Sequence, residues 1–404
     1  MTLNNNQVAE LLNDAFPQST GEGEIEKLSL QDFIDKGNDP NVIGSVEQFN
    51  KKLLNVIIKR WYEDSSYRSS YKDPFFQDSE RFGALTELVS IEIPEAQPSL
   101  AWQNFGPDTA HGQVDEVGSY KVYLPQISTK VYGKSDSWQV CVTITGEQWD
   151  SAFHSASELA TYVARIHMQV DNGIIMHLKN MQRANVNSYM AEKINYAGKQ
   201  GAEGLHVVDL VKEYVEEMGD PTAAFTVEDY MSTSAALVHG AEKIGYYKDL
   251  FGEMSSIFNI EGKNRFTPDD RIVLEMLSAF ERRFTSVAAS NTYHKELIAM
   301  PNYIKVPFWQ ALGVGDFDTV SSIDVEIADS DEQSGKKEVK QGGIVAFLAD
   351  SWALAHTTVN RRQAVKNFEP ENLTNHYSQF VDRYFNNLGM NAVVFVLNDY
   401  TPAA

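Results

Sequence analysis

The chain has 404 residues, of which 34 are Lys or Arg and 56 are Asp or Glu, so its formal net charge is −22 at pH 7. Such an excess of carboxylates repels nucleic acid unless a local cluster of cations overrides it, which argues against a dedicated nucleic-acid-binding protein. The length predicts roughly two or three domains. The single cysteine, Cys141, allows no internal disulfide, which fits folding in a reducing cytoplasm.

The first residues, Met1–Asn6, lack the basic start and apolar core of a signal peptide, and no apolar run of about 18 residues follows that would span a membrane. Residues 1–84 are predicted to form an arm rich in amide and acidic side chains. Within it, Ser45 and Gln48 form a capping box ahead of an apolar stripe that ends at Trp61. A short one-sided helix of this kind needs a surface to pack on.

From residue 85 to residue 145 the hydrophobic period is two, which is typical of strands. The alternation predicts one strand that ends at Pro94, a second near 122–124 and a third over 138–144. We interpret them as a long antiparallel excursion with one apolar face. Thr145 and Gln148 then cap a short helix.

The stretch from Ser155 to Ile194 predicts one long helix, which Ser155 and Glu158 begin as a capping box. Its apolar residues are spaced three or four apart, on one helical face. They are Ala156, Leu159, Val163, Ile166, Val170, Ile174, Leu178 and Met181. At ~1.5 Å per residue this stripe is about 38 Å long.

Residues 205–390 predict an α/β lobe. Helices are expected at 205–217, 227–240 and 278–289. The residues Thr267–Asp270, with proline at the first helical position, fit a helix start by themselves. The residues that follow favour a strand over 272–276. Further strands are expected at 323–327 and 344–349, and the apolar run 392–397 predicts a strand inside a sheet.

No pattern in the sequence predicts a catalytic residue, a cofactor or a metal ligand. The nine histidines form no HExxH motif, and His167 and His177 lie about 280° apart around a helix. Gly313-Val314-Gly315 lacks the preceding strand and the third glycine of a phosphate loop. Asp329-Ser330-Asp331 begins like a calcium loop, but Ser334 stands where that loop needs glycine, so we expect a hairpin turn.

Three short stretches, and their order, carry a resemblance to a known family. They are Thr145–Phe153, Thr267–Arg271, and Gly342–Trp352 followed by Asn391–Val396. With these stretches the chain resembles a tailed-phage major capsid protein of the Hong Kong 97 type, over about residues 85–398. Within that class it most resembles the capsid proteins of small short-tailed (podovirus) phages.

The resemblance implies an α+β capsid fold with five parts. They are an N-terminal arm (1–84), an extended β loop (85–145), a peripheral domain with the long spine helix (146–204), an axial domain (205–390) and a C-terminal strand and tail (391–404).

The resemblance also implies a structural protein and not an enzyme. Copies would form pentamers and hexamers of an icosahedral shell around a double-stranded DNA genome, assembled in the host cytoplasm. Partners would be portal or scaffold proteins, with weak non-specific proximity to packaged DNA and no membrane. We expect the long helix and the excursion to lie on neighbouring copies, each burying an apolar face that a monomer leaves wet. The arm would become ordered on the next subunit.

Three alternatives stay open. An encapsulin-type bacterial compartment would share the fold and enclose an enzyme. A tail or portal component would form a tube or a ring. A cytosolic α/β hydrolase or transferase would place its site in the loop 313–318, where Asp316 and Asp318 flank Phe317, or near His356. Such an enzyme would lose activity when Asp316 or His356 is changed.

Overall fold

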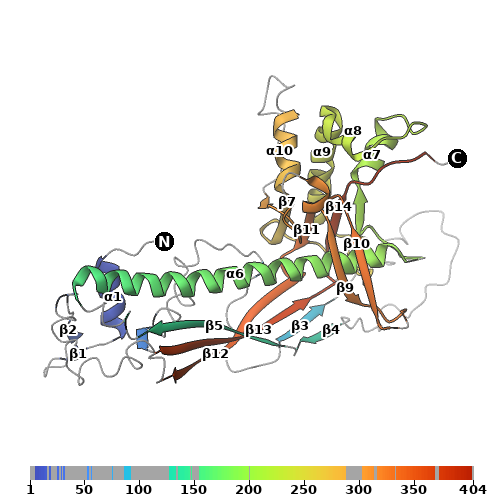
Figure 1. Ribbon diagram of the computed structural model, residues 1–404. Helices are drawn as coiled ribbons and strands as arrows, with labels where there is room; N and C mark the ends of the chain where they lie inside the picture. The colour runs from blue at the N-terminus through green and yellow to red at the C-terminus, as the bar shows by residue number, and fades with distance from the viewer. Residues whose placement is uncertain are drawn as a thin grey trace, which may run out of the picture. The chain divides into compact units, whose positions relative to one another are not determined.

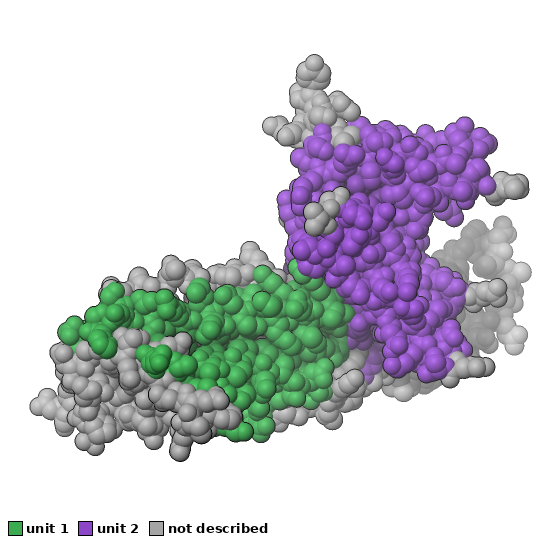
Figure 2. All heavy atoms as spheres, in the orientation of Figure 1, with its two compact units in different colours: residues 1–84, 134–186, 355–385 green, residues 85–133, 187–354, 386–404 purple. Residues whose placement is uncertain are grey.

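Helix α6, Ala156–Ala197, is the longest element that a computed structural model of the chain describes (Figure 1). The structure describes residues 5–15, 18–19, 25–26, 86–91, 127–132, 135–145, 154–199, 201–287, 303–313, 316–332, 334–368 and 373–402, with the isolated residues 29, 31, 52, 53, 56, 75 and 147. The chain divides into two compact units (Figure 2). Unit 1 holds residues 1–84, 134–186 and 355–385, and unit 2 holds 85–133, 187–354 and 386–404.

Unit 1 contains a three-stranded antiparallel sheet in the order β12-β13-β5. Its strands are β5 (Asp136–Thr145), β12 (Leu354–Phe368) and β13 (Leu373–Asn386). The register of β13 on β5 runs from Leu373 opposite Thr145 to Asp382 opposite Asp136. Helix α1 (Asn5–Ala15) and the short strands β1 (Gln18–Ser19) and β2 (Ile25–Glu26) belong to the same unit.

The apolar stripe of α6 packs on this sheet, as the helical spacing predicts. Six of its eight residues are buried: Leu159, Val163, Ile166, Val170, Ile174 and Leu178. They form one core with Val142 and Ile144 of β5, Phe380 of β13 and Leu12 of α1. The Ser155 hydroxyl accepts a hydrogen bond from the Glu158 amide at 3.2 Å, so the predicted cap begins the helix.

This packing corrects one expectation. The apolar face of α6 was expected to be buried by a neighbouring copy, but the three-stranded sheet of the same chain covers it. This sheet was not expected from the sequence, because residues 355–385 were predicted to lie in the α/β lobe and β5 in the excursion. The buried positions of β13 include His376, Ser378 and Asp382, so the strand lacks the alternating hydrophobic signal on which strand prediction depends.

Strands β3 (Thr86–Ile91) and β4 (Ile127–Tyr132) form a separate antiparallel pair within unit 2. The strand predicted to end at Pro94 is therefore present up to Ile91. Positions 122–124, where the returning strand was expected, lie outside the described residues, and so do most of the predicted arm helix and the capped helix after Thr145.

A five-stranded sheet forms the centre of unit 2, in the order β6-β14-β11-β7-β8. Its strands are β6 (Val207–Asp209), β7 (Ile272–Leu277), β8 (Ile304–Val306), β11 (Ile344–Asp350) and β14 (Ala392–Val396). The predicted strands at 272–276, 344–349 and 392–397 are confirmed, and β14 lies in the interior of the sheet. Strands β9 (Ile323–Ala328) and β10 (Lys336–Gln341) form the hairpin expected around the acidic turn.

Helices cover both faces of this sheet, which explains why β11 and β14 are buried along their whole length. Phe347 of β11 lies opposite Val394 in the ladder, whereas Phe395 lies opposite Ala346, so the two phenylalanines point to opposite faces. The Tyr189 ring of α6 packs on Phe347 at 5.8 Å, and the Tyr247 ring packs on Phe395 at 5.7 Å. Tyr247 lies on α9 (Ser234–Phe251).

The other helices of unit 2 differ from prediction at their ends. The helix expected at 205–217 is α7 (Leu210–Glu217), because β6 occupies 207–209 and the Asp209 carboxylate caps the amides of Val211 and Lys212. The helix expected at 227–240 is two helices, α8 (Val227–Ser232) and α9, separated at Thr233. The short η3 (Asp269–Arg271) precedes β7, α10 (Ser278–Val287) follows it, and α11 spans Phe317–Val320.

We predict that Ile174→Ala lowers the free energy of unfolding by about 2–5 kcal/mol, because Ile174 is fully buried under the sheet of unit 1. Met176, two residues on, is 64% exposed, so Met176→Ala should change it by less than about 0.5 kcal/mol. Urea unfolding of both variants measures the difference. Equal losses would mean that the stripe of α6 is not buried in this way.

Candidate functional site

Polar side chains fix the last part of α6 inside unit 2. The Asn187 amide donates to the Trp309 carbonyl at 3.0 Å, and the Tyr189 hydroxyl donates to the Asn387 carbonyl at 3.3 Å. Lys193, fully buried, donates to the Phe258 carbonyl at 2.9 Å. Because each bond reaches a different segment of the unit, residues 187–193 are held by directional contacts as well as by packing.

The end of α6 is tied to the β9–β10 hairpin by a cluster of charges. The Asp329 carboxylate accepts hydrogen bonds from the Asn195 amide at 2.7 Å and from the Lys199 ammonium at 3.1 Å. The Lys199 ammonium also binds Asp331 at 2.6 Å. The bond from Asn195, with those from the Asp331 amide and Lys199, lowers the pKa of Asp329 to about 2.

This cluster explains the stretch that begins like a calcium loop. The Lys199 ammonium bridges the carboxylates of Asp329 and Asp331, so a cationic side chain stands between the two groups that would hold a metal ion. Gly335, directly after Ser334, has φ 69° and closes the turn. The predicted hairpin turn is confirmed, and throughout the described ranges no group of three or more His, Cys, Asp or Glu side chains is placed to hold a metal.

Two of the stretches that carried the resemblance meet in unit 2. Arg271 forms a bidentate ion pair with Asp350, which is almost fully buried at the end of β11. The Thr267 hydroxyl donates to the same carboxylate at 3.3 Å. The Arg271 guanidinium lies 4.0 Å from the ring centre of Trp352. Residues of the stretch Thr267–Arg271 are therefore bonded to Asp350 of the stretch Gly342–Trp352, and neither stretch alone could indicate this contact.

One face of α6 in unit 1 stays exposed. Its exposed residues between 161 and 180 are Thr161, Arg165, Met168, Gln169, Asn172, Met176, Lys179 and Asn180. None of these carries a carboxylate, although the chain as a whole is strongly acidic. Met168 and Met176 are 46% and 64% exposed, and methionine side chains adapt well to a partner surface.

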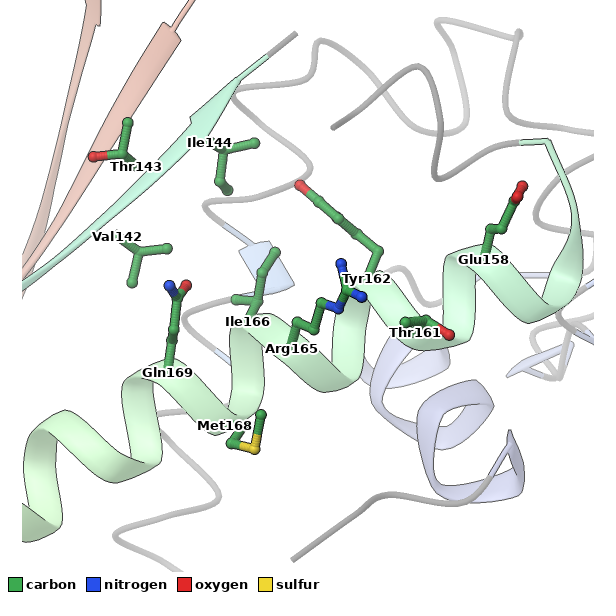
Figure 3. A pocket seen from close by; sticks show the side chains of 10 residues that line it. All are labelled: Val142, Thr143, Ile144, Glu158, Thr161, Tyr162, Arg165, Ile166, Met168 and Gln169. Carbon is green, nitrogen blue, oxygen red and sulfur yellow. The ribbon is translucent and has the colours of Figure 1, made fainter. Parts of the chain in front are cut away.

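A groove of about 440 Å³ lies between this part of α6 and β5. Figure 3 shows Tyr162 and Ile166 of α6 directed toward Ile144, and Met168 directed away from it. Strand β5 is at the edge of its sheet, and no strand in the described part of the chain pairs with its outer edge. An unpaired edge beside a groove with both polar and apolar lining can accept an added strand.

The residues proposed for an enzyme have structural partners. The Asp316 carboxylate caps α11 through the Asp318 amide at 3.1 Å and also accepts from the Thr319 hydroxyl at 2.8 Å. His356 is buried and stacks on the Tyr384 ring at 5.5 Å. Asp316 therefore has a structural role as a helix cap, and His356 has one in the packing of unit 1.

The two histidines of α6 both lie in the packing of unit 1. His177 stacks on Trp138 at 3.9 Å, and burial lowers its pKa. His167 is buried.

None of the described helices is both long and apolar enough to cross a membrane.

Sequence reasoning missed the anchoring residues of α6. Asn187, Lys193, Asn195 and Lys199 are polar residues after the apolar stripe ends, and such residues are ordinarily on a solvent-facing surface. The one sequence feature that could have indicated these contacts is that the predicted helix continues beyond Met181, where the apolar stripe ends.

Comparison with known proteins gives one family. A family model described as Phi29-like phage major capsid protein matches residues 21–396. No curated protein sequence matches the chain.

Solved structures of phage capsids resemble the chain at low sequence identity. The capsid of Staphylococcus phage Andhra is 12% identical with a TM-score of 0.48, and the match covers 78% of this chain and 81% of that one. The capsid of cyanophage P-SCSP1u is 8% identical with a TM-score of 0.39, covering 80% and 86%. A chain from Mycobacterium phage Adephagia is 13% identical with a TM-score of 0.38, covering 83% and 94%.

We predict that Asp329→Asn makes the chain less stable at neutral pH and less sensitive to acid. The folded pKa of Asp329, about 2, is below its ordinary 3.8, so the stability it contributes is complete above pH ~4 and is lost as the pH falls toward 2. Urea unfolding between pH 5 and pH 2 measures this loss.

Asp331→Asn is the matched control, because the Asp331 side chain is 71% exposed. It should keep most of the acid sensitivity of the unchanged chain. If the two variants have the same pH profile, the buried carboxylate of Asp329 does not hold the hairpin.

Proposed function

Since the chain belongs to the Phi29-like phage major capsid protein family, we propose how its parts build the shell. It is a structural protein of the virion that assembles with copies of itself and associates with other virion proteins. The observation that carries this function is the family match over residues 21–396. The order of the described elements agrees with it: a strand pair, then a long helix, then a lobe whose last strand returns to the sheet.

The proposed division of the chain follows the capsid fold. Residues 1–84 form the arm, 85–145 the extended loop, 146–204 the peripheral domain, 205–390 the axial domain and 391–404 the closing strand and tail. We move β5 from the extended loop to the peripheral domain and add β12 and β13 to it, because β13 pairs with β5 and the three strands form one sheet. Strands β3 and β4 form the described part of the extended loop.

In the assembled state, copies are arranged as pentamers and hexamers of an icosahedral shell around double-stranded DNA. Assembly takes place in the host cytoplasm, and a portal and a scaffold are the expected partner proteins. The phage is of the short-tailed kind. The proposed role is structural and uses no catalytic residue; Asp316 serves as a helix cap and His356 packs on Tyr384.

The contact between copies uses what α6 leaves exposed. The apolar stripe is already covered within unit 1, so it contributes nothing further to association. Met168, Met176 and the groove beside β5 remain, and a segment of a second copy would cover them. Burying two partly exposed methionines in every copy multiplies a modest gain over the closed shell.

We predict that the purified chain forms closed particles in negative-stain images. We also predict that the double variant Met168→Asp with Met176→Asp has a critical concentration for assembly that is higher by tenfold or more. The reason is that each copy would bury two carboxylates where apolar side chains fit, each at a cost of about 1–3 kcal/mol. The unfolding free energy should change little, since both residues are exposed.

Met168→Leu with Met176→Leu is the matched control, because it keeps the apolar area and should assemble like the unchanged chain. If the unchanged chain stays a single copy or forms only a ring or a tube, the shell is contradicted. If the Asp variant assembles normally, the shell stands but this face of α6 is not the contact.

A further inference from the structure

A lysine and a histidine face each other in the interior of unit 2. Lys193 of α6 is 0% exposed and His206 is 1% exposed. The Lys193 Nζ lies 3.4 Å from the His206 Nδ1, and the His206 Nε2 lies 3.0 Å from the Glu203 carbonyl oxygen. A buried lysine beside a buried histidine requires a carboxylate or a fixed protonation state to be tolerated.

The geometry fixes the protonation state of the histidine. A carbonyl oxygen only accepts hydrogen bonds, so the His206 Nε2 carries a proton and donates a hydrogen bond to the Glu203 carbonyl. The Nδ1 of this neutral ring then carries a lone pair, and it accepts a hydrogen bond from the Lys193 ammonium. A second proton on His206 would occupy that lone pair and place two cations 3.4 Å apart.

Among the residues that the structure describes, no carboxylate pairs with Lys193 or His206. The titratable and charged groups on the elements packed here are Tyr189, Glu192 and Tyr196 on α6, Glu203 before β6 and Asp209 at its end, Tyr247 on α9, and Glu261, Lys263 and Arg265 in the segment 255–266. Asp209 caps α7, and Glu261 binds Lys263 and Lys130. Burial alone raises the pKa of Glu192, which shows no effect of a nearby cation. Strand β14 presents only apolar side chains on its buried length.

The pair joins several segments. The Phe258 carbonyl accepts from Lys193 at 2.9 Å and from the Ala392 amide of β14 at 3.1 Å. Next to it, the Leu205 amide donates to the Ile257 carbonyl at 2.7 Å. A Cβ on Gly204 would lie 2.5 Å from that carbonyl oxygen, so the approach of the two segments requires glycine. The segment 255–266 is therefore held at Phe258 through Lys193.

We propose that Lys193 and His206 form an acid-sensitive latch, which holds the segment 255–266 against α6 and β14 at neutral pH and releases it when His206 gains a proton. Released, the segment would uncover Phe258, which is fully buried, beside Ile257 and Phe266, which are already 42% and 48% exposed. The latch is a property of the folded chain and does not rest on shell assembly.

The direction of both pKa changes agrees with this geometry. Burial lowers the pKa of Lys193 from 10.5 to about 7 and is the main cause that lowers the pKa of His206 from 6.5 to about 4. Both folded values are below the unfolded ones, so protonation favours the open chain. The contribution of His206 is complete above pH 6.5 and is lost as the pH falls toward 4, whereas that of Lys193 declines earlier, from 10.5 to 7.

The test is hydrogen–deuterium exchange of the full chain at pH 7 and pH 4, corrected for the intrinsic pH dependence of exchange. In the unchanged chain, the opening equilibrium of amides in 255–266 should increase by on the order of a hundredfold. His206→Gln, whose amide can donate to Glu203 and accept from Lys193 without titrating, should open less than threefold more at pH 4 than at pH 7.

His239→Gln is the matched control, since His239 is buried in the same unit but lies 3.2 Å from the Glu217 carboxylate. It should keep the full acid opening. If His206→Gln opens as much as the unchanged chain, or if His239→Gln abolishes the opening, the latch is wrong. Should His206→Gln fail to fold, Lys193→Met is the second test: it removes the donor that holds the Phe258 carbonyl, so the amides of 255–266 should already be open at pH 7, and unchanged protection there overturns the proposal.

Discussion

The fold of unit 1 depends on burial of one face of α6 by a sheet from the same chain. Leu159, Val163, Ile174 and Leu178 are each 1% exposed or less, and a side chain of this size contributes about 1.5–3 kcal/mol when it leaves water. The apolar stripe accounts for the length of the helix up to residue 181. Because the sheet already covers this stripe, α6 leaves uncovered its opposite face and the groove beside β5.

The chemistry that holds α6 changes along its length. Up to Leu178 the contacts are apolar, and the hydrophobic effect that stabilises them is non-directional. From Asn187 onward the contacts are hydrogen bonds and ion pairs to separate segments of unit 2, and such bonds are lost when the partner moves by about an ångström. The last three turns therefore fix the register of the helix. For a protein copied many times in one closed shell, a fixed register keeps every copy alike.

The sequence predicted the elements whose own residues determine them. The stripe of α6 and the apolar runs of β11 and β14 have a period and a length that leave few alternatives. It did not predict β12 and β13, because their inward side chains include His376, Ser378 and Asp382, which are buried only by virtue of partners far away in the chain. It also could not assign Lys199 to Asp329, since the two are 130 residues apart and each is an ordinary surface residue by type. The family, by contrast, was predicted from three stretches, two of which meet at Asp350.

Protection of α6 in a single, unassembled copy tests this account most directly. Hydrogen–deuterium exchange on the free chain, kept below its assembly concentration, should show slow exchange at the amides of 159–178 and of 187–195, because the same chain buries both sections. If the amides of 159–178 exchange as fast as an exposed helix and become slow only in particles, the apolar face is buried by neighbours. In that case, the central claim that the chain covers its own long helix is contradicted.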